Sequence, residues 1–372
     1  MPPPGRILTV NAGSSSLKLR VLDEEDRVVC SRDSGSIGDE SALREELEAI
    51  LADGGLIEAA GHRVVHGGPD FTGPTVLDPS VEDKLDHLAD LAPLHNPPAV
   101  AAIRALEALA PGLPTVACFD TAFHSTMPAA PSTYALPAAW RERWPLRRYG
   151  FHGLSHAYAS RRAAKLLGRP LAELRTVTAH LGAGASLCAV EGGHSVDTTM
   201  GFTPLEGLVM ATRSGSIDPG LLLWVQRHGS IEAEEMERAL DRESGLLALS
   251  GRSGDMREIV AGIGEGDEGC RLAFDVYIHR LAAAIAAMAA AMGGLDALVF
   301  TGGVGENSDR VRTAAVARMD FLGIGLDPRL NAEADGDQRL SDASAAVPVV
   351  VVQAREDLEI GAQVRRALFP TT

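Results

Sequence analysis

The stretch VNAGSSSLKLRVLD, Val10 to Asp23, gives the first indication of the architecture. A strand-like run over residues 6–10 leads into a loop of small residues, and apolar and basic side chains then alternate from Leu17 to Val21. Alternation with a period of two predicts a strand. A phosphate-binding P-loop would instead need Gly-x-x-x-x-Gly-Lys-Ser/Thr running into a helix. The sequence therefore predicts a hairpin whose Gly-Ser tip aims backbone N–H groups and hydroxyls at a ligand.

The same pattern occurs again in TVTAHLGAGASLCAVEGGHSV, Thr176 to Val196. A β-branched run enters a loop of Gly, Ala and Ser, an apolar run follows, and the stretch from Glu191 to His194 turns the chain. Both copies predict the order strand, turn, strand, turn, strand. The repeat indicates an α/β chain of two related domains whose tips hold a polyphosphate in one cleft, although two unrelated hairpins would give the same pattern.

A third loop of small residues occurs in LDALVFTGGVGE, Leu295 to Glu306. Its first half predicts a short buried strand, and Thr301 to Gly305 predict a sharp glycine turn. Asn307 or Ser308 is then expected to cap a helix over residues 309 to about 319. The glycine spacing is not that of a Rossmann fingerprint, but a strand, a glycine turn and a helix in this order suit a nucleotide. Three such loops in one chain predict a nucleoside phosphate as ligand.

Composition limits the classes of protein to consider. The chain has 372 residues, of which 45% are hydrophobic, enough for two domains or one large one. Its formal net charge of −16 argues against a nucleic-acid surface. The four cysteines show no CxxC spacing, which is typical of free thiols in a reducing cytosol. The first residues lack the apolar core of a signal peptide, and the longest apolar run, Leu281 to Met292, predicts a buried helix. We therefore expect a cytoplasmic protein without a membrane or nucleic-acid partner.

Several long blocks resemble the acetate kinases, which form the acetokinase family of the acetate and sugar kinase/Hsp70/actin superfamily. The blocks are NAGSSSLK (11–18), GHRVVHGG (61–68), LAPLHNPP (91–98), FDTAFHSTMP (119–128), YGFHGLSH (149–156), GFTPLEGL (201–208), TRSGSIDPG (212–220) and GGVGEN (302–307). The resemblance implies two duplicated actin-like, ribonuclease H-like α/β domains around an active-site cleft, usually in a homodimer. It places an N-terminal domain at residues 1–125 plus 358–372 and a nucleotide-binding domain at 126–357.

The family's reaction is the reversible, Mg²⁺-dependent transfer of a phosphoryl group from ATP to acetate, by direct in-line transfer to give acetyl phosphate and ADP. By matching motif positions, the resemblance implies that Arg63 and Arg213 hold the carboxylate and the transferring group. Asp120 would organise the magnesium and His152 would stabilise the phosphoryl group. The remaining positions implied by the resemblance are a methyl pocket of Val65, Leu94, Phe151 and Pro204; metal-side residues Asn11 and Glu356; and nucleotide-side residues Lys18, His180, Gly182, Gly184, Asp255, Arg257, Gly303 and Gly305.

The chemistry explains why such residue types are needed. A carboxylate is already ionised at pH 7, so it needs no general base. The difficulty is repulsion between two anions, and cations and positioning should carry the catalysis. A sugar kinase would need a base, for which Asp120 could serve, and many hydrogen-bonding groups; the apolar pocket favours a short acyl chain instead. Acetate and propionate differ by one methylene, worth only about 1–3 kcal/mol, so propionate or another short-chain acid stays an alternative.

The chain departs from the family pattern at three places. Ala183 stands where Asn is common, so we expect weaker nucleotide binding or a different phosphate donor, such as pyrophosphate. Arg355 brings a positive charge beside the expected metal carboxylate. The segment between Val28 and Gly61 is short, which predicts a trimmed surface. A non-catalytic nucleotide sensor on the same fold remains a further alternative, although the two arginines and His152 argue against it.

Overall fold

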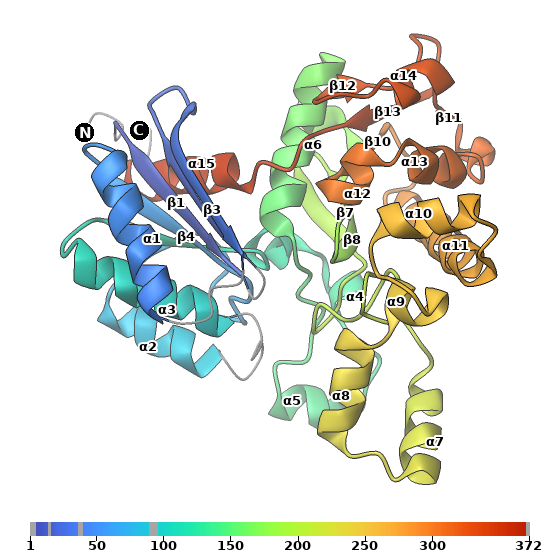
Figure 1. Ribbon diagram of the computed structural model, residues 1–372, viewed down its shortest axis with the longest axis horizontal. Helices are drawn as coiled ribbons and strands as arrows, with labels where there is room; N and C mark the ends of the chain where they lie inside the picture. The colour runs from blue at the N-terminus through green and yellow to red at the C-terminus, as the bar shows by residue number, and fades with distance from the viewer. Residues whose placement is uncertain (1–4, 14–15, 36–39, 89–95, 370–372) are drawn as a thin grey trace. The chain divides into compact units, whose positions relative to one another are not determined.

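The computed structural model of the chain describes residues 5–13, 16–35, 40–88 and 96–369 (Figure 1). The chain divides into two compact units, each described separately below. The first contains Met1–Ser125, Phe151–Tyr158 and Arg355–Thr372, and the second contains Thr126–Gly150 and Ala159–Ala354. Leu94 and two serines of the first Gly-Ser loop, Ser14 and Ser15, lie outside the described residues.

The first unit is built on a sheet with the strand order β3-β2-β1-β4-β6-β5. Strands β1, β2 and β3 form an antiparallel meander, while β1, β4 and β6 run parallel to one another. The hairpin expected from the opening stretch is therefore confirmed. The strands are β1 (Ile7–Ala12), β2 (Ser16–Leu22), β3 (Val28–Gly35), β4 (Ala59–Val64), β5 (Thr75–Val76) and β6 (Thr115–Phe119).

Strand alternation decides which helix covers which face of this sheet. Leu8 and Val10 pack in one cluster with residues of α1 (Glu40–Asp53) and α3 (Asn96–Leu109). Ile7 points to the other face, where it packs with residues of α15 (Glu356–Leu368). Helix α2 (Pro79–His87) packs beside α3. The sheet is thus covered on both faces, and its parallel strands are held rigidly.

The second unit repeats this arrangement. Its sheet has the order β11-β13-β10-β7-β8-β9, in which β7, β8 and β9 form an antiparallel meander and β7, β10 and β13 run parallel. A register shift between the second and third strands of the meander occurs in both sheets. The predicted duplication is confirmed. The strands are β7 (Arg175–Leu181), β8 (Ala185–Glu191), β9 (His194–Thr198), β10 (Ala297–Thr301), β11 (Ile324–Gly325), β12 (Gln338–Arg339) and β13 (Val347–Val351).

The third glycine-rich stretch corrects the sequence prediction. Residues Gly302–Asn307 form a short helix, α12, instead of an open turn. Gly302 has a φ of +78°, and a Cβ there would lie 2.8 Å from the Leu181 carbonyl oxygen, so only glycine fits between β10 and β7. Ser308 caps the next helix, α13 (Asp309–Val316), as expected, but α13 ends about one turn before Met319.

The long helix α11 (Glu268–Ala291) lies against β7, β8, α9 (Gly245–Ser250) and α10 (Met256–Gly264). It is the one described helix with the length and composition to cross a membrane, and half of its apolar stretch is buried in the protein. All four cysteines are free thiols, as expected. The other helices are α4 (Ala129–Ser132), α5 (Ala138–Arg143), α6 (Gly153–Leu167), α7 (Pro219–Gly229), α8 (Ala233–Arg242) and α14 (Pro328–Ala332).

Candidate active site

Four of the predicted residues meet at one edge of the first sheet. Asn11 and Arg63 are the penultimate residues of β1 and β4, and Asp120 directly follows β6. Since these strands are parallel, their carboxyl ends lie at the same edge, where α/β proteins usually bind ligands. Glu356, the first residue of α15, joins them.

The four side chains form one hydrogen-bonded cluster. Arg63 donates from Nε and Nη2 to Oδ2 of Asp120, at 3.0 and 2.6 Å, and from Nη1 to Oδ1 of Asn11 at 3.1 Å. Asn11 donates from Nδ2 to Oε2 of Glu356 at 2.7 Å, and this oxygen lies 3.8 Å from Nε of Arg63. The arginine is therefore fixed from three sides before any ligand is bound.

The cluster contains two carboxyl groups, those of Asp120 and Glu356, but only one positively charged side chain, that of Arg63. Asp120 is fully buried, and burial raises the pKa of its carboxyl group to about 6; Arg63 and, more weakly, the backbone N–H of Leu154 oppose this shift, and Glu356 adds to it. Burial lowers the pKa of Arg63, but the charges of Asp120 and Glu356 outweigh burial and raise it overall. Oδ1 of Asp120 accepts no hydrogen bond from the described residues. Two carboxylates thus share one arginine, and one buried carboxylate oxygen is left for a further cation.

Two adjoining residues are held by the backbone. His152 has a φ of +57°, a conformation that costs a histidine energy and is kept only where the surroundings impose it. The next residue, Gly153, donates its N–H to the Asp120 carbonyl at 3.0 Å. A side chain at Gly153 would overlap that carbonyl. The turn that carries His152 is therefore tied to the strand end that carries Asp120.

Buried histidines fix Phe151, the predicted pocket residue. Burial lowers the pKa of His124 to about 4, so its ring is neutral, and its Nε2 donates to the Phe151 carbonyl at 2.9 Å. The ring of His66 meets that of Phe151 edge to face, with centroids 5.4 Å apart. Neither histidine could be assigned a role from the sequence, because only the fold brings them to residue 151.

The acyl pocket is only partly described by the structure. Val65 and Phe151 are buried in the first unit. Leu94 lies outside the described residues, and Pro204 belongs to the second unit. Lys18 is exposed on β2, directly opposite Asn11 in the hairpin register. The shared pocket and the nucleotide role of Lys18 therefore stay predictions.

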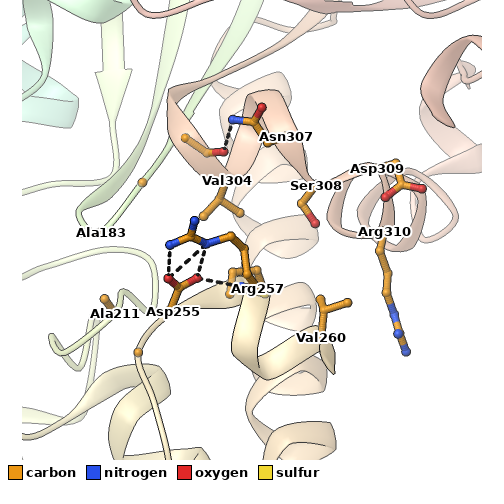
Figure 2. A pocket seen from close by; sticks show the side chains of 14 residues that line it. Ala183, Ala211, Asp255, Arg257, Val260, Val304, Asn307, Ser308, Asp309 and Arg310 are labelled. Carbon is orange, nitrogen blue, oxygen red and sulfur yellow. Dashed lines mark hydrogen bonds and ion pairs between the residues drawn. The ribbon is translucent and has the colours of Figure 1, made fainter. Parts of the chain in front are cut away.

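The second unit contains a cavity of about 950 Å³ (Figure 2). Four of the predicted nucleotide-side residues line it: Gly182, Asp255, Arg257 and Gly303. The described residues that line it do not include His180, Gly184 or Gly305, although each of these lies within two residues of a lining residue in the chain. The other lining residues are Ala183, Ala211, Gly254, Met256, Val260, Val304, Asn307, Ser308, Asp309 and Arg310.

Polar groups on the cavity wall are pre-arranged. Asp255 caps α10, accepting from the Arg257 N–H at 2.8 Å, and pairs with the Arg257 guanidinium at 2.5 Å (Figure 2). Asn307 donates from Nδ2 to the Gly303 carbonyl at 2.8 Å. Met256, Val260 and Val304 add apolar surface. A large cavity with apolar walls and a few fixed polar groups suits a nucleoside. The sequence pointed to Asn307 and Ser308 only as candidate helix caps after the glycine-rich stretch, and it did not assign them to the cavity wall.

Two further predicted residues meet in the second unit. Arg213 donates from Nη1 to the carbonyl of Pro204 at 2.7 Å. Burial lowers the pKa of Arg213, and the charge of Asp241 opposes that shift. Within the described residues no carboxylate pairs with Arg213 at ion-pair distance, so its positive charge remains available to an anion.

Two of the three departures from the family pattern, at Ala183 and Arg355, can be interpreted from the structure. Ala183 lines the cavity, and its carbonyl accepts the Ala211 N–H at 3.1 Å. Arg355 turns to Asp357, donating from Nη2 to Oδ2 at 2.7 Å and from Nε to Oδ1 at 2.9 Å. The added charge of Arg355 is thus largely neutralised by a carboxylate two residues away.

Comparison with known proteins agrees with this geometry. A sequence model of the acetokinase family matches residues 36–362. The chain belongs to the acetokinase family. An acetate kinase of Synechococcus sp. (strain JA-2-3B'a(2-13)) is 46% identical to this acetokinase, covering 95% of this chain and 97% of its relative. An acetate kinase of Leifsonia xyli subsp. xyli (strain CTCB07) is 47% identical, covering 97% and 98% of the two chains.

Solved structures give the same result for the fold of this acetokinase. The crystal structure of Porphyromonas gingivalis acetate kinase superposes with a TM-score of 0.90 at 36% identity, covering 98% of this chain and all of that one. A propionate kinase from Francisella tularensis subsp. tularensis SCHU S4 matches with the same TM-score at 33% identity, over 98% and 100% of the chains. The expected duplicated actin-like fold is confirmed.

Proposed function

We propose that this acetokinase is an acetate kinase that transfers the γ-phosphoryl group of ATP to acetate, reversibly, giving acetyl phosphate and ADP. The observation that carries the proposal is the cluster of Arg63, Asp120, Asn11 and Glu356. It fixes a cation beside an unsatisfied carboxylate oxygen at the ligand-binding edge of the sheet. The relatives named acetate kinase, at 45–47% identity over most of the chain, support the same activity.

The reacting groups need charge compensation more than acid–base chemistry. The acetate carboxylate is ionised at neutral pH and attacks the phosphorus directly, while the γ-phosphate carries several negative charges. Arg63 and Arg213 bind the carboxylate and the equatorial oxygens of the transferring group, where planar two-pronged contacts are strong. His152, held in its strained turn beside Asp120, donates to the same oxygens. Each of these groups is already oriented, so little reorganisation accompanies the transfer.

The chemistry of the first cluster also fits Mg²⁺. This ion prefers oxygen ligands and is usually held by one or two carboxylates together with substrate phosphates. The described residues contain no group of three or more His, Cys, Asp or Glu side chains that could hold a metal ion by themselves. Asp120, through its unsatisfied Oδ1, and Glu356 would hold Mg²⁺, with Asn11 toward its water shell. When bound, Mg²⁺ neutralises phosphate charge.

The cavity of about 950 Å³ in the second unit binds the nucleoside part of ATP. Its apolar wall accepts the base, while Asn307 and the pair of Asp255 and Arg257 offer polar contacts. A donor without a nucleoside, such as pyrophosphate, would have no use for such a cavity. ATP is therefore the donor that best fits the second unit.

Propionate is the second candidate acceptor, because a solved propionate kinase matches this fold as well as the acetate kinases do. One methylene changes binding by only about 1–3 kcal/mol. We expect acetate to be preferred and propionate to be turned over more slowly.

The test is to incubate the purified protein with Mg·ATP, hydroxylamine and one acid, and to measure acyl hydroxamate. Parallel reactions contain acetate, propionate or butyrate, and another set replaces ATP by pyrophosphate. Product that depends on both acetate and ATP supports the proposal, and the relative rates rank the acids. No product from a folded protein that still binds ATP would contradict it and favour a nucleotide sensor.

We also propose that the chain forms a homodimer in the cytoplasm. Helix α7 leaves Leu221, Leu223 and Trp224 half or more exposed, which is costly in water and is relieved when a second copy covers them. Sedimentation analysis should give twice the monomer mass. A Trp224→Glu variant should sediment as a monomer, and a wild-type monomer at micromolar concentration would contradict the proposal.

A further inference from the structure

Three side chains of the second unit form a compact network outside the predicted site. Oη of Tyr134 donates to Oε2 of Glu206 at 2.6 Å, and Nη2 of Arg148 donates to Oε1 of the same carboxylate at 2.7 Å. The Arg148 guanidinium also lies over the Tyr134 ring, 5.6 Å from its centroid. Both carboxylate oxygens of Glu206 are therefore engaged. We refer to Tyr134, Arg148 and Glu206 as the clamp.

The clamp holds the start of the loop that follows β9. Nη1 of Arg148 donates to the carbonyls of Thr199 and Met200, at 3.0 and 3.1 Å. The Phe202 N–H donates to Oη of Tyr134 at 2.9 Å. Gly201, between them, leaves no room for a side chain, because a Cβ would overlap Glu206 and Tyr134. The backbone on one side of Pro204 is thus fixed by three hydrogen bonds.

Glu206 fixes the other side of Pro204, because it belongs to the same loop and its own carboxylate is tied to Tyr134 and Arg148. The next residue, Gly207, closes the loop onto Ser216: its N–H donates to Ser216 Oγ at 3.1 Å, and its carbonyl accepts the Ser216 N–H at 2.9 Å. Pro204 therefore lies on a short segment held at both ends, and the position of its carbonyl is set by the clamp.

That carbonyl is what orients Arg213. The one side-chain hydrogen bond that the described residues give Arg213 goes to the Pro204 carbonyl, at 2.7 Å. A half-buried guanidinium with a single neutral partner takes its direction from that partner. A displacement of Pro204 would therefore displace the cation that meets the anionic substrate.

We propose that Tyr134, Arg148 and Glu206 are positioning residues that fix Arg213 through the Pro204 carbonyl. The inference rests on the proposed function, because it takes Arg213 as a group that contacts the reacting anion. An error of about 1 Å in the placement of such a group can cost on the order of 10²-fold in rate. None of the three clamp residues lines the nucleotide cavity, so substitutions in the clamp should leave the affinity for ATP nearly unchanged.

The test compares Glu206→Gln and Tyr134→Phe with the wild type. Glu206→Gln keeps the shape and loses the charge that binds Arg148, and Tyr134→Phe loses the hydroxyl that joins Glu206 to Phe202. We expect kcat to fall on the order of 10- to 100-fold, with the KM for Mg·ATP changed less than about twofold. Matched controls are Glu333→Gln, which breaks an exposed ion pair with Arg329, and Tyr277→Phe, whose buried hydroxyl has no hydrogen bond within the described residues.

A double-substitution experiment separates positioning from general loosening. In an Arg213→Ala background, Glu206→Gln should lower the residual kcat by less than about twofold, because the group it positions is gone. Hydrogen exchange of residues 201–216 should be faster in Glu206→Gln than in the wild type or Glu333→Gln. The proposal is overturned if Glu206→Gln costs the same factor in both backgrounds, or if exchange in this segment is unchanged.

Failure of the proposed function would look different. If the wild type forms no acyl phosphate from any acid, acetate kinase activity is refuted, while the exchange measurement still tests whether the clamp fixes the loop. If Tyr134→Phe does not fold, Glu206→Gln carries the test by itself.

Discussion

At the scale of single residues, Asp120 and Arg63 illustrate how burial gives ordinary side chains a special role. Their types and positions could be matched from the sequence, but their mutual contact and the unsatisfied oxygen of Asp120 come from the strand ends that meet beside α15. Burial raises the pKa of Asp120 because its charge is removed from water, and Arg63, together with the backbone N–H of Leu154, opposes that shift. Such perturbed groups are common at functional sites.

Ala183 gives a prediction about nucleotide binding. It lines the cavity with a methyl group where the family pattern commonly has Asn. We expect Ala183→Asn to lower the KM for ATP several-fold, since a new amide adds hydrogen bonds worth about 0.5–1.5 kcal/mol each. Steady-state kinetics measure this, with Ala211→Ser on the same wall as the control. Unchanged KM and kcat in Ala183→Asn would show that the side chain at position 183 does not affect nucleotide binding or turnover.

His62 gives a prediction about pH. Its ring is 1% exposed, neither nitrogen has a hydrogen bond from the described residues, and burial lowers its pKa to about 3. The unfolded chain, with a pKa near 6.5, binds the proton between pH 6.5 and 3 while the folded protein does not. His62 therefore costs stability as the pH falls through that window, by about 1.4 kcal/mol per pH unit.

The variant that tests this is His62→Leu, which keeps an apolar group of similar size. Its free energy of unfolding, taken as the difference from the wild type, should be about 2 kcal/mol larger at pH 5 than at pH 8, meaning that the substitution stabilises the protein more at the lower pH. Urea unfolding at both pH values measures the difference. Equal differences at pH 5 and pH 8 would mean that His62 takes up its proton in the folded protein.

At the scale of elements, close packing between β4 and α15 positions the cluster. Gly61 faces α15, and a Cβ at this glycine would lie 2.5 Å from Cγ2 of Ile360 and 2.6 Å from Cγ2 of Val364. The same helix starts with Glu356, and the same strand carries Arg63 two residues after Gly61. The distance between strand and helix therefore sets the distance between the two charged groups.

Gly61→Ala is expected to be destabilising because the added methyl must push α15 outward. Overpacking of this kind costs about 1–3 kcal/mol, measured by urea unfolding, and kcat should fall as Glu356 moves away from Arg63. Gly73→Ala is the matched control, since a Cβ there meets no atom within 4 Å. The interpretation fails if the two alanine variants are equally stable.

At the scale of the whole molecule, the predicted functions are divided between the two units. Asn11, Arg63, Asp120, His152 and Glu356 belong to the first unit, while Arg213 and every residue that lines the cavity proposed to bind the nucleotide belong to the second. Nucleotide binding and phosphoryl transfer should therefore be separable by substitution.

Arg63→Ala is expected to lower kcat on the order of 10³-fold or more, as the loss of an arginine does in other phosphoryl-transfer enzymes. Its Kd for ATP should stay within about a factor of three, or about 0.7 kcal/mol, because the cavity contains no residue of the first unit. Calorimetric titration with ATP measures this, with Arg44→Ala, which loses only a surface pair with Glu48, as control. Loss of ATP binding in folded Arg63→Ala, or near-normal turnover, would contradict the assignment of nucleotide binding and phosphoryl transfer to different units.

The sequence by itself determined the local elements and the family. Period-two alternation from Leu17 to Val21 predicted the first hairpin, because side chains of a strand alternate between its faces wherever one face is buried. The β-branched and apolar runs on either side of the second small-residue loop predicted the other hairpin. The motif blocks contain the residues of the acetokinase pattern. Asn307 or Ser308 was expected as a helix cap, and Ser308 is that cap.

Tertiary structure alone decided the rest, because it depends on contacts between residues far apart in the chain. Gly302 starts helix α12 where the sequence predicted an open turn, and the carbonyl of Leu181 on a neighbouring strand leaves space only for glycine there. Asn11 and Glu356 are 345 residues apart and share a hydrogen bond. The clamp joins Tyr134 to Glu206 in the same way, across 72 residues. Spacing along a sequence records local geometry, whereas a charge, a pKa and an orientation are set by whatever the fold packs around them.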